Sequence, residues 1–337
     1  MLKNWKFWLG AIVSALFLTI ALRGLDLAQV WVYMKSANYG WIIPGAGVYF
    51  IGVWVRTWRW HYLLRSVKFI PTKDLWTTVV IGYMGNNIYP FRAGEVLRAY
   101  VLRRKFQVSM SASIATILVE RVFDGLVMLL FVFIALPYTP GLPEWLRQTV
   151  ILASIAFFAA LAIFLIMAAL PEKSRTLYQW GFDKFLPPKY RDTALILADR
   201  FMIGVKSLNS LPNVVMIFFT SVVIWLLETV KYWFVMHAFY FTVSFFALML
   251  MNGVVNLATT IPSAPGYIGT FDAPGIAVLE VFGVPGDIAA AYTLVLHAAL
   301  WLPITLLGAW YMLSESMSWT DFGKAVAARD EIETGET

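Results

Sequence analysis

The stretch GNNIYPFRAGEVLRAYVLRR, from Gly85 to Arg104, decides the expected fold of this chain. It sets two asparagines, a proline and a Glu–Arg cluster beside apolar sequence of membrane-spanning length. Lipid cannot satisfy exposed backbone groups, so irregular, charged sequence at membrane depth must be covered by protein or line a cavity. A second irregular stretch, Asn256 to Gly283, lies in the other half of the chain. Two interrupted segments at corresponding positions of two halves are typical of a binding site in mid-membrane.

The composition is that of an all-α, polytopic helical membrane protein. The 337 residues are 60% hydrophobic and 14% charged, whereas a soluble domain carries about 25% charged residues. The 15 Trp, 15 Tyr and 25 Phe residues suit two interfacial aromatic belts. The chain has no cysteine, which excludes a disulfide, a thiolate metal site and a cysteine nucleophile. We attribute the net charge of +6 to topology signals and expect no nucleic-acid partner.

Six full spans are predicted from apolar runs of about 20 residues. They lie near residues 5–23, 41–63, 109–136, 149–170, 213–240 and 287–313. Lysine and arginine gather in alternate loops, which predicts that both termini are cytoplasmic. The basic residues assigned to the cytoplasmic side are Lys3, Lys6, Arg65, Lys68, Lys73, Arg98, Arg103, Arg104, Lys105, Lys173, Arg175, Lys184, Lys189, Arg191, Arg200 and Lys206.

This orientation predicts two re-entrant helical hairpins. The segment 75–102 starts and ends among cytoplasmic basic residues, so it enters and returns from one side, with a break at Asn86–Pro90. By the same parity, 243–283 enters from the outer side and breaks near Pro262–Gly266. Each hairpin and its two flanking spans form one unit, and the two units form an inverted repeat. In the alternative, both segments cross fully and the chain has eight full spans.

A single transmembrane domain is expected over residues 1–320. Its cytoplasmic segment 171–211 carries an amphipathic helical stripe at 191–208. The tail 321–337 is polar and acidic, a composition typical of disorder.

The strongest chemical signal is a cluster of ionisable residues inside the span 109–136. Asp124 lies about 40° from Glu120 and about 60° from Arg121 around the helix, so the three share one arc. Charges inside a membrane are costly and mark candidate functional sites, although ion pairing that sets helix registry would also explain them. Two carboxylates beside one arginine need a further cation. The candidates for it are Arg56, Arg92, Arg98 and Lys231.

Other ionisable residues receive local explanations. Glu228 and Lys231 are three residues apart on one helix and can pair with each other. Arg59 and Arg65 are expected to be interfacial anchors among tryptophans. The histidines are expected to be isolated and structural rather than metal ligands; they are His61, His237 and His297.

The hairpin breaks can also bind a ligand through backbone groups. A half-helix that begins after Gly94 or Gly266 points unpaired N–H groups and its positive dipole end at the break, which favours a phosphate. Gly269 permits close approach, and Thr270 adds a hydroxyl. Alternatively, the prolines and glycines only shape the turns.

No catalytic signature is present, because the sequence contains no Walker A, HExxH, Gly-x-Ser-x-Gly or dinucleotide motif. No catalytic residue, cofactor or metal is therefore expected. An acid/base role for Glu95 or Glu120 stays open, without a paired nucleophile.

Several short motifs of these charged and interrupted segments follow one another over residues 50–312. They are Arg56-x-x-Arg59-Trp60, Asn87-x-x-Pro90 with Gly94-Glu95 and Arg98, Glu120-Arg121-x-x-Asp124, and Pro262-x-x-Pro265-Gly266-x-Ile268-Gly269. In this series the chain resembles the lysylphosphatidylglycerol synthase transmembrane, or flippase-like, family. The resemblance implies a bacterial or archaeal cell-membrane protein related to lipid flippase domains. Two-part members carry a soluble synthase domain after the membrane part; we expect none here, and lipid handling rather than aminoacyl transfer.

The expected function is binding and translocation of a lipid or lipid-linked headgroup, with a phospholipid or a lipid-linked glycan as substrate. The alternatives are a membrane-embedded transferase on a lipid-linked substrate and a non-catalytic partner of a lipid-modifying enzyme; a homo-oligomer also stays open. Arginines would contact phosphate, and carboxylates would hold the arginines or a cationic headgroup. The predicted substrate-binding residues are Asn86, Asn87, Arg92, Glu95, Arg98, Glu120, Arg121, Asp124, Glu228, Lys231, Gly266, Gly269 and Thr270.

Overall fold

The computed structural model describes residues 5–89, 92–140, 170–188, 211–261, 263–315 and 317, with scattered positions between 148 and 199. Every element in these residues is a helix, as predicted. The predictions for the span 149–170, the stripe 191–208 and the tail 321–337 fall wholly or mostly outside the described residues.

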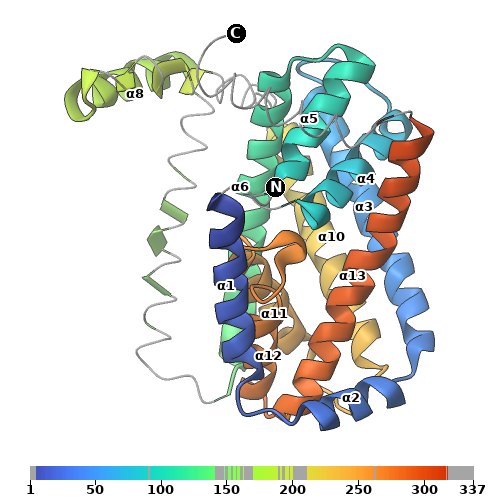
Figure 1. The fold of residues 1–337 in the computed structure, drawn as a ribbon. Helices are drawn as coiled ribbons and strands as arrows, with labels where there is room; N and C mark the ends of the chain where they lie inside the picture. The colour runs from blue at the N-terminus through green and yellow to red at the C-terminus, as the bar shows by residue number, and fades with distance from the viewer. Residues whose placement is uncertain are drawn as a thin grey trace.

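Most of the bundle consists of two units that follow each other in sequence, coloured blue to green and yellow to red in Figure 1. The first unit contains α3 (Ile42–Leu64), α4 (Thr72–Ile88), α5 (Ala93–Phe106) and α6 (Met110–Ala135). The second contains α10 (Leu211–Met236), α11 (Phe245–Ala258), α12 (Asp272–Val281) and α13 (Gly286–Ser314). Between the units in sequence lies α8 (Pro171–Phe185), a helix that was not predicted. Short 3-10 turns complete the described elements: η1 (Tyr39–Trp41), η2 (Leu136–Tyr138) and η4 (Pro265–Tyr267).

The N-terminal helix α1 (Trp5–Leu22) runs along the second unit, where it packs on α12. The next helix, α2 (Leu27–Ser36), turns from it by 86°. Asp26 sets this turn, because its carboxylate accepts hydrogen bonds from the backbone N–H groups of Ala28 and Gln29 and caps α2.

The two units contact each other in a reciprocal pattern. Helix α3 packs along α10, α4 packs on α13, and α11 packs on α6, which is the counterpart of the α4–α13 contact. Helices α3 and α10 run antiparallel, since Gly45 lies against Val235 at one end while Arg59 reaches Ser221 at the other. Exchanging the two units therefore reproduces the contact pattern, as in two repeats of opposite orientation.

Each unit contains a helical hairpin. In the first, Lys68 Nζ donates to the carbonyl oxygen of Phe106 at 2.8 Å, so the open ends of α4 and α5 lie together. Gly94 lets the two helices touch, because a Cβ there would lie 2.0 Å from the carbonyl oxygen of Gly82. In the second, α11 packs on α12, and the loop between them lies at mid-height of the bundle (Figure 1).

The first break lies later in the chain than predicted, and the second is longer than predicted and contains the predicted range. Helix α4 continues to Ile88 and ends only at Tyr89, whose φ of −113° and ψ of 144° are extended. The following Pro90 disfavours helical backbone at the preceding residue, so the asparagines stay in the last turn of α4. The second break runs from 259 to 271, and α12 begins at Asp272, six residues after Gly266.

Hydropathy alone undercounts the helices of spanning length. By length and composition, Pro212–Met236 and Gly286–Ser314 can cross a membrane, and Gly10–Leu22 with Leu27–Ser36 passes as one bent pair. Helices α3 and α6 have 23 and 26 residues, or about 35–39 Å. They carry the ionisable side chains that build the site.

Candidate ligand-binding site

A cavity of about 150 Å³ lies where the two hairpin tips meet. Helices α3, α4, α6, α10 and α13 and the loop after α11 form its wall. Of the predicted substrate-binding residues, those that line it are Asn86, Asn87, Arg92, Arg121, Glu228, Lys231 and Gly266. Those that do not line it are Glu95, Arg98, Glu120, Asp124, Gly269 and Thr270.

The wall between α3 and α10 is a buried charge cluster. Arg56 Nη2 donates to Glu228 Oε1 at 2.9 Å, and Lys231 Nζ pairs with the other carboxylate oxygen. The predicted Glu228–Lys231 pair is confirmed, with Arg56 added to it. Lys231 Nζ lies 4.5 Å from the centroid of Tyr49, and Arg56 Cζ lies 4.9 Å from that of Trp225, both cation–π contacts. One carboxylate therefore serves two cations.

The wall between α5 and α6 holds two arginines that share one carboxylate. Arg121 Nε lies 3.5 Å from Glu95 Oε1, and Arg92 Nη1 lies 3.8 Å from the same atom. All three side chains keep 26–28% of their surface exposed. Arg92 Nε, Arg121 Nε and Glu95 Oε1 have no hydrogen-bond partner among the described residues. Arg121 Nη2 also lies 3.3 Å from Asp124 Oδ2 and 3.9 Å from Glu120 Oε2. The contacts with Glu95 are long, and the partial exposure of both arginines leaves their guanidinium groups accessible from the cavity that they line.

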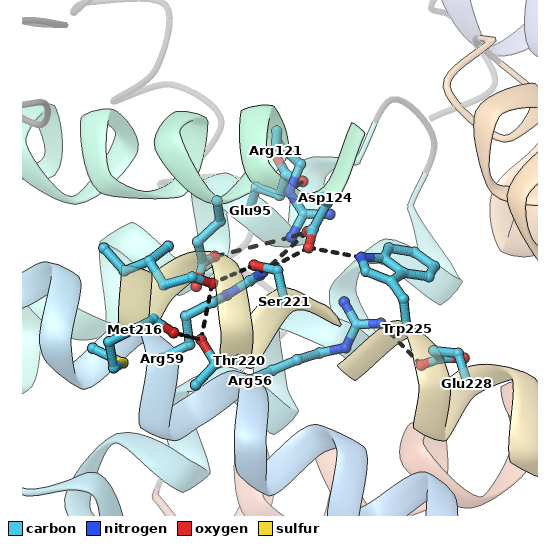
Figure 2. Close-up of polar contacts among 12 residues, drawn as sticks. Arg56, Arg59, Glu95, Arg121, Asp124, Met216, Thr220, Ser221, Trp225 and Glu228 are labelled. Atoms are coloured by element: carbon cyan, nitrogen blue, oxygen red, sulfur yellow. Dashed lines mark hydrogen bonds and ion pairs between the residues drawn. The ribbon is translucent and has the colours of Figure 1, made fainter. Parts of the chain in front are cut away.

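Two tighter ion pairs lie behind the cavity wall; we call Arg59–Asp124 and Arg98–Glu120 the inner pairs. Arg59 Nη1 and Nη2 donate to the two oxygens of Asp124 at 2.7 and 3.2 Å. Trp225 Nε1 donates to Asp124 as well, at 3.0 Å (Figure 2). The cation that Glu120 required is thus Arg98, one of the predicted candidates, whereas Asp124 uses a residue outside that set.

Arg59 is therefore not the interfacial anchor that was expected. Its side chain is 1% exposed, and Nη1 also donates to Ser221 Oγ at 2.6 Å. A bidentate carboxylate and a hydroxyl from two other helices replace the water that an anchor would keep. Arg65, by contrast, is exposed and lies over the Tyr62 ring at 4.8 Å.

The inner pairs and the cavity wall together contain more basic than acidic side chains. Six basic side chains face four carboxylates among the described residues of the site, an excess of two. The basic residues are Arg56, Arg59, Arg92, Arg98, Arg121 and Lys231, and the acidic ones are Glu95, Glu120, Asp124 and Glu228. Unmatched cations in a largely buried site favour an anionic ligand.

Both hairpin tips are tied to α13. Asn87 Nδ2 donates to the carbonyl oxygen of Trp301 at 3.2 Å and to Thr305 Oγ1 at 2.8 Å. Trp301 Nε1 donates back to the carbonyl oxygen of Asn87 at 3.2 Å. Gly266, at φ 74°, lies against the same indole, and a Cβ there would sit 2.9 Å from Trp301 Nε1. Position 266 therefore needs glycine for both its backbone and its close packing.

His297 is not isolated, contrary to the prediction. Nδ1 lies 2.8 Å from Asp272 Oδ1, and Nε2 lies 2.7 Å from the carbonyl oxygen of Gly266. Both ring nitrogens therefore face acceptor oxygens, one of a carboxylate and one of a backbone carbonyl. His297 thereby joins α13 to α12 and to the second break. Among the described residues, no three His, Asp or Glu side chains gather in a way that could hold a metal ion.

Gly269 and Thr270 pack the second break instead of reaching the cavity. A Cβ at Gly269 would lie 2.6 Å from the carbonyl oxygen of Ser14 in α1. The hydroxyl of Thr270 contacts Ser263 Oγ at 3.0 Å and the carbonyl oxygen of Tyr267 at 3.1 Å. Because α12 starts only at Asp272, these residues fold into the loop rather than opening a half-helix toward a ligand.

The sequence analysis did not predict the remaining uncharged residues of the cavity lining, most of which are aromatic. These residues are Tyr49, Tyr83, Trp225, Tyr232, Asn256, Thr259, Tyr267, Phe271, Leu300 and Trp301. Helical periodicity could have predicted part of this lining. Tyr49 lies seven residues before Arg56, and Trp225 seven before Tyr232, so the two members of each pair fall about 20° apart on one face of the helix. The residues of the second break have no periodicity that could reveal them.

Comparison with known proteins agrees with this organisation. A family model described as the lysylphosphatidylglycerol synthase TM region matches residues 7–308. The chain belongs to this family. Its matched range contains most of α1, both units except the end of α13, and every residue of the cavity. The chain is accordingly a multi-pass helical membrane protein of the lysylphosphatidylglycerol synthase TM region family.

Archaeal membrane proteins are among its relatives. A UPF0104 membrane protein of Methanocaldococcus jannaschii is 24% identical over 316 residues, 91% of this chain and 94% of the relative. Another, of Methanothermobacter thermautotrophicus, is 27% identical over 274 residues, 76% of this chain and 77% of the relative. Glycosyltransferase AglD of Haloferax volcanii is 23% identical over 331 residues, 89% of this chain and 52% of the relative. No solved structure matches the chain.

Proposed function

We propose that this protein binds the phosphate-bearing headgroup of an anionic membrane lipid in the cavity and carries it across the cell membrane. One observation supports the proposal above the others: a cavity between two interrupted hairpins is walled by more cations than carboxylates. Guanidinium groups with unused N–H donors match phosphate oxygens in charge and geometry. The acyl chains stay in the bilayer while the headgroup uses the polar cavity.

In this proposal both hairpins are re-entrant and the cavity lies near the middle of the bilayer. Six full spans, with 149–170 among them, put both termini in the cytoplasm, and residues 1–320 act as one domain. Alternating access results from rocking one unit against the other, and the α3–α10 contact forms part of the cavity wall.

The relatives add chemical context. One of them is named a glycosyltransferase, which is compatible with a lipid-linked glycan as well as a phospholipid as the substrate here. A homo-oligomer or a complex with a lipid-modifying enzyme is compatible with the same cavity.

Reconstitution tests the proposal. The purified full chain is placed in liposomes, and the sided accessibility of a labelled anionic phospholipid is followed. Arg121→Gln is expected to slow its movement by about tenfold or more, because a charge-assisted bond to phosphate contributes about 1.5–3 kcal/mol. The matched control is Arg65→Gln, an exposed arginine outside the cavity, which should keep the rate of the unaltered protein.

Equal rates for Arg121→Gln and the unaltered protein, both well folded, would contradict the site. No movement of any phospholipid, together with product formed on a lipid-linked substrate, would favour a transferase. No movement, together with stable co-purification of a lipid-modifying enzyme, would favour a partner subunit.

A further inference from the structure

We infer that the cavity selects phosphate esters of neutral polyhydroxyl groups, a sugar or a polyol, over headgroups that carry an amine. The inference rests on the proposed function and names the headgroup class of the same cavity. It differs from the aminoacylated headgroup in the description of the family.

An amine has no acidic partner to bind in this cavity. Glu228 is the one carboxylate among the lining residues of the described chain, and Arg56 and Lys231 occupy both of its oxygens. Four lining side chains are cationic, so a further ammonium group would meet repulsion. The ring faces of Tyr49 and Trp225, which could hold a quaternary amine, already cover the protein's own cations.

Hydroxyl groups, by contrast, find free partners. The phenol groups of Tyr49, Tyr83 and Tyr267 line the cavity and have no hydrogen-bond partner among the described residues. Phenol and amide groups donate to and accept from sugar hydroxyls, and aromatic faces cover the C–H faces of a ring. A bare phosphate would leave these polar groups unpaired.

The phosphate itself is assigned to Arg92 and Arg121. They are the most exposed basic side chains of the wall, at 26% and 28%. Their shared carboxylate, Glu95, lies outside the lining, and the other two carboxylates near Arg121 are each paired with a second arginine.

The test compares three lipids by native mass spectrometry of the purified full chain in detergent. Phosphatidylinositol and phosphatidylserine carry the same net charge, but one ends in a polyol and the other in an amine with a carboxylate; phosphatidic acid carries phosphate alone. We expect phosphatidylinositol to bind at least about tenfold more tightly than phosphatidylserine. Phosphatidic acid should bind about three- to tenfold more weakly than phosphatidylinositol, because it leaves one or two hydrogen bonds unmade.

A conservative variant separates recognition from folding. Tyr83→Phe should weaken phosphatidylinositol about three- to tenfold and leave phosphatidic acid unchanged. Its control is Tyr240→Phe, an 82% exposed tyrosine outside the cavity, which should change neither. Equal loss for both lipids would show a general packing defect and overturn the role of the hydroxyl.

Each further outcome separates this inference from the proposed function. Phosphatidylserine binding as tightly as phosphatidylinositol overturns the inference and leaves an anionic-lipid transporter intact. Phosphatidic acid binding as tightly as phosphatidylinositol also overturns the inference and leaves an anionic-lipid transporter intact. Soluble inositol 1-phosphate binding as tightly as the lipid supports the headgroup class but contradicts a lipid substrate. Failure of all three lipids to bind folded protein overturns both.

Discussion

Two arginine clusters meet at Arg121 and are built in opposite ways. In Arg59–Asp124, each donor faces its own oxygen at 2.7 and 3.2 Å, and both side chains are 1% exposed. In Arg92–Glu95–Arg121, two arginines share one oxygen at 3.8 and 3.5 Å, and more than a quarter of each side chain is exposed. The Arg59 guanidinium is bound by buried protein groups, whereas those of Arg92 and Arg121 stay partly exposed beside the cavity. The first cluster therefore holds the bundle, and the second is available to a ligand.

The largest loss of stability is expected when the buried ion pair Arg59–Asp124 is broken. Asp124→Leu leaves the Arg59 guanidinium buried without its carboxylate and removes the acceptor of Trp225 Nε1. Unfolding in mixed detergent micelles should then show a loss of about 3–5 kcal/mol in the free energy of unfolding.

A double variant checks the cause. Arg59→Met with Asp124→Leu removes both charges and should regain most of that stability, since apolar replacement of a whole buried pair is often neutral. A single variant that loses less than about 1 kcal/mol would mean that Arg59–Asp124 does not hold the bundle.

The next largest effect is expected when the two helices of the first hairpin are forced apart. This change moves Arg92 and Glu95 away from Arg121 but leaves Arg59–Asp124 in place. Gly94→Ala would put a Cβ 2.0 Å from the carbonyl oxygen of Gly82. We expect a loss of about 1–3 kcal/mol from overpacking, together with lost binding of anionic lipid. Gly125→Ala in α6 is the matched control, because its Cβ meets nothing within 4 Å. Equal stability of the two variants would argue against close packing of α4 on α5.

A smaller effect is expected from a substitution within the Arg92–Glu95–Arg121 cluster itself. Glu95→Gln removes the carboxylate shared by Arg92 and Arg121, so the excess positive charge of the site rises by one. Stability should change by about 1 kcal/mol or less, because the group is partly exposed. Affinity for an anionic lipid should rise about threefold or more in the same mass-spectrometric titration. Weaker binding than in a Glu172→Gln control would mean that Glu95 contributes to the ligand site itself.

The smallest effect is expected at an ion pair outside both clusters. Lys105 Nζ lies 2.5 Å from Glu315 Oε1, with side chains 27% and 31% exposed. Glu315→Gln should cost about 0–1 kcal/mol, and the difference should shrink as salt is added. A loss as large as that of Asp124→Leu would break the link between burial, complete pairing and stability.

Much of the fold could be predicted because its signals are local. Apolar runs located α1, α3, α6, α10 and α13 within a few residues, and Pro and Gly located the two breaks approximately. The pairing of Glu228 with Lys231 was also predictable, because residues three apart on a helix are neighbours. The exact ends of the breaks were not, since a helix continues as long as its backbone bonds are made, as it does through Asn86 and Asn87.

The sequence by itself determined that this chain is helical and membrane-embedded, that two helices are interrupted, and that charges lie at membrane depth. These properties depend on neighbours along the chain. Only the tertiary structure decided which charged side chains pair with each other and stabilise the fold. Arg59 finds Asp124 across 65 positions and Arg56 finds Glu228 across 172, while Arg92 and Arg121 share Glu95 at 3.8 and 3.5 Å and stay partly exposed. The physical reason is that pairing depends on which helices pack together, and no local pattern encodes that choice.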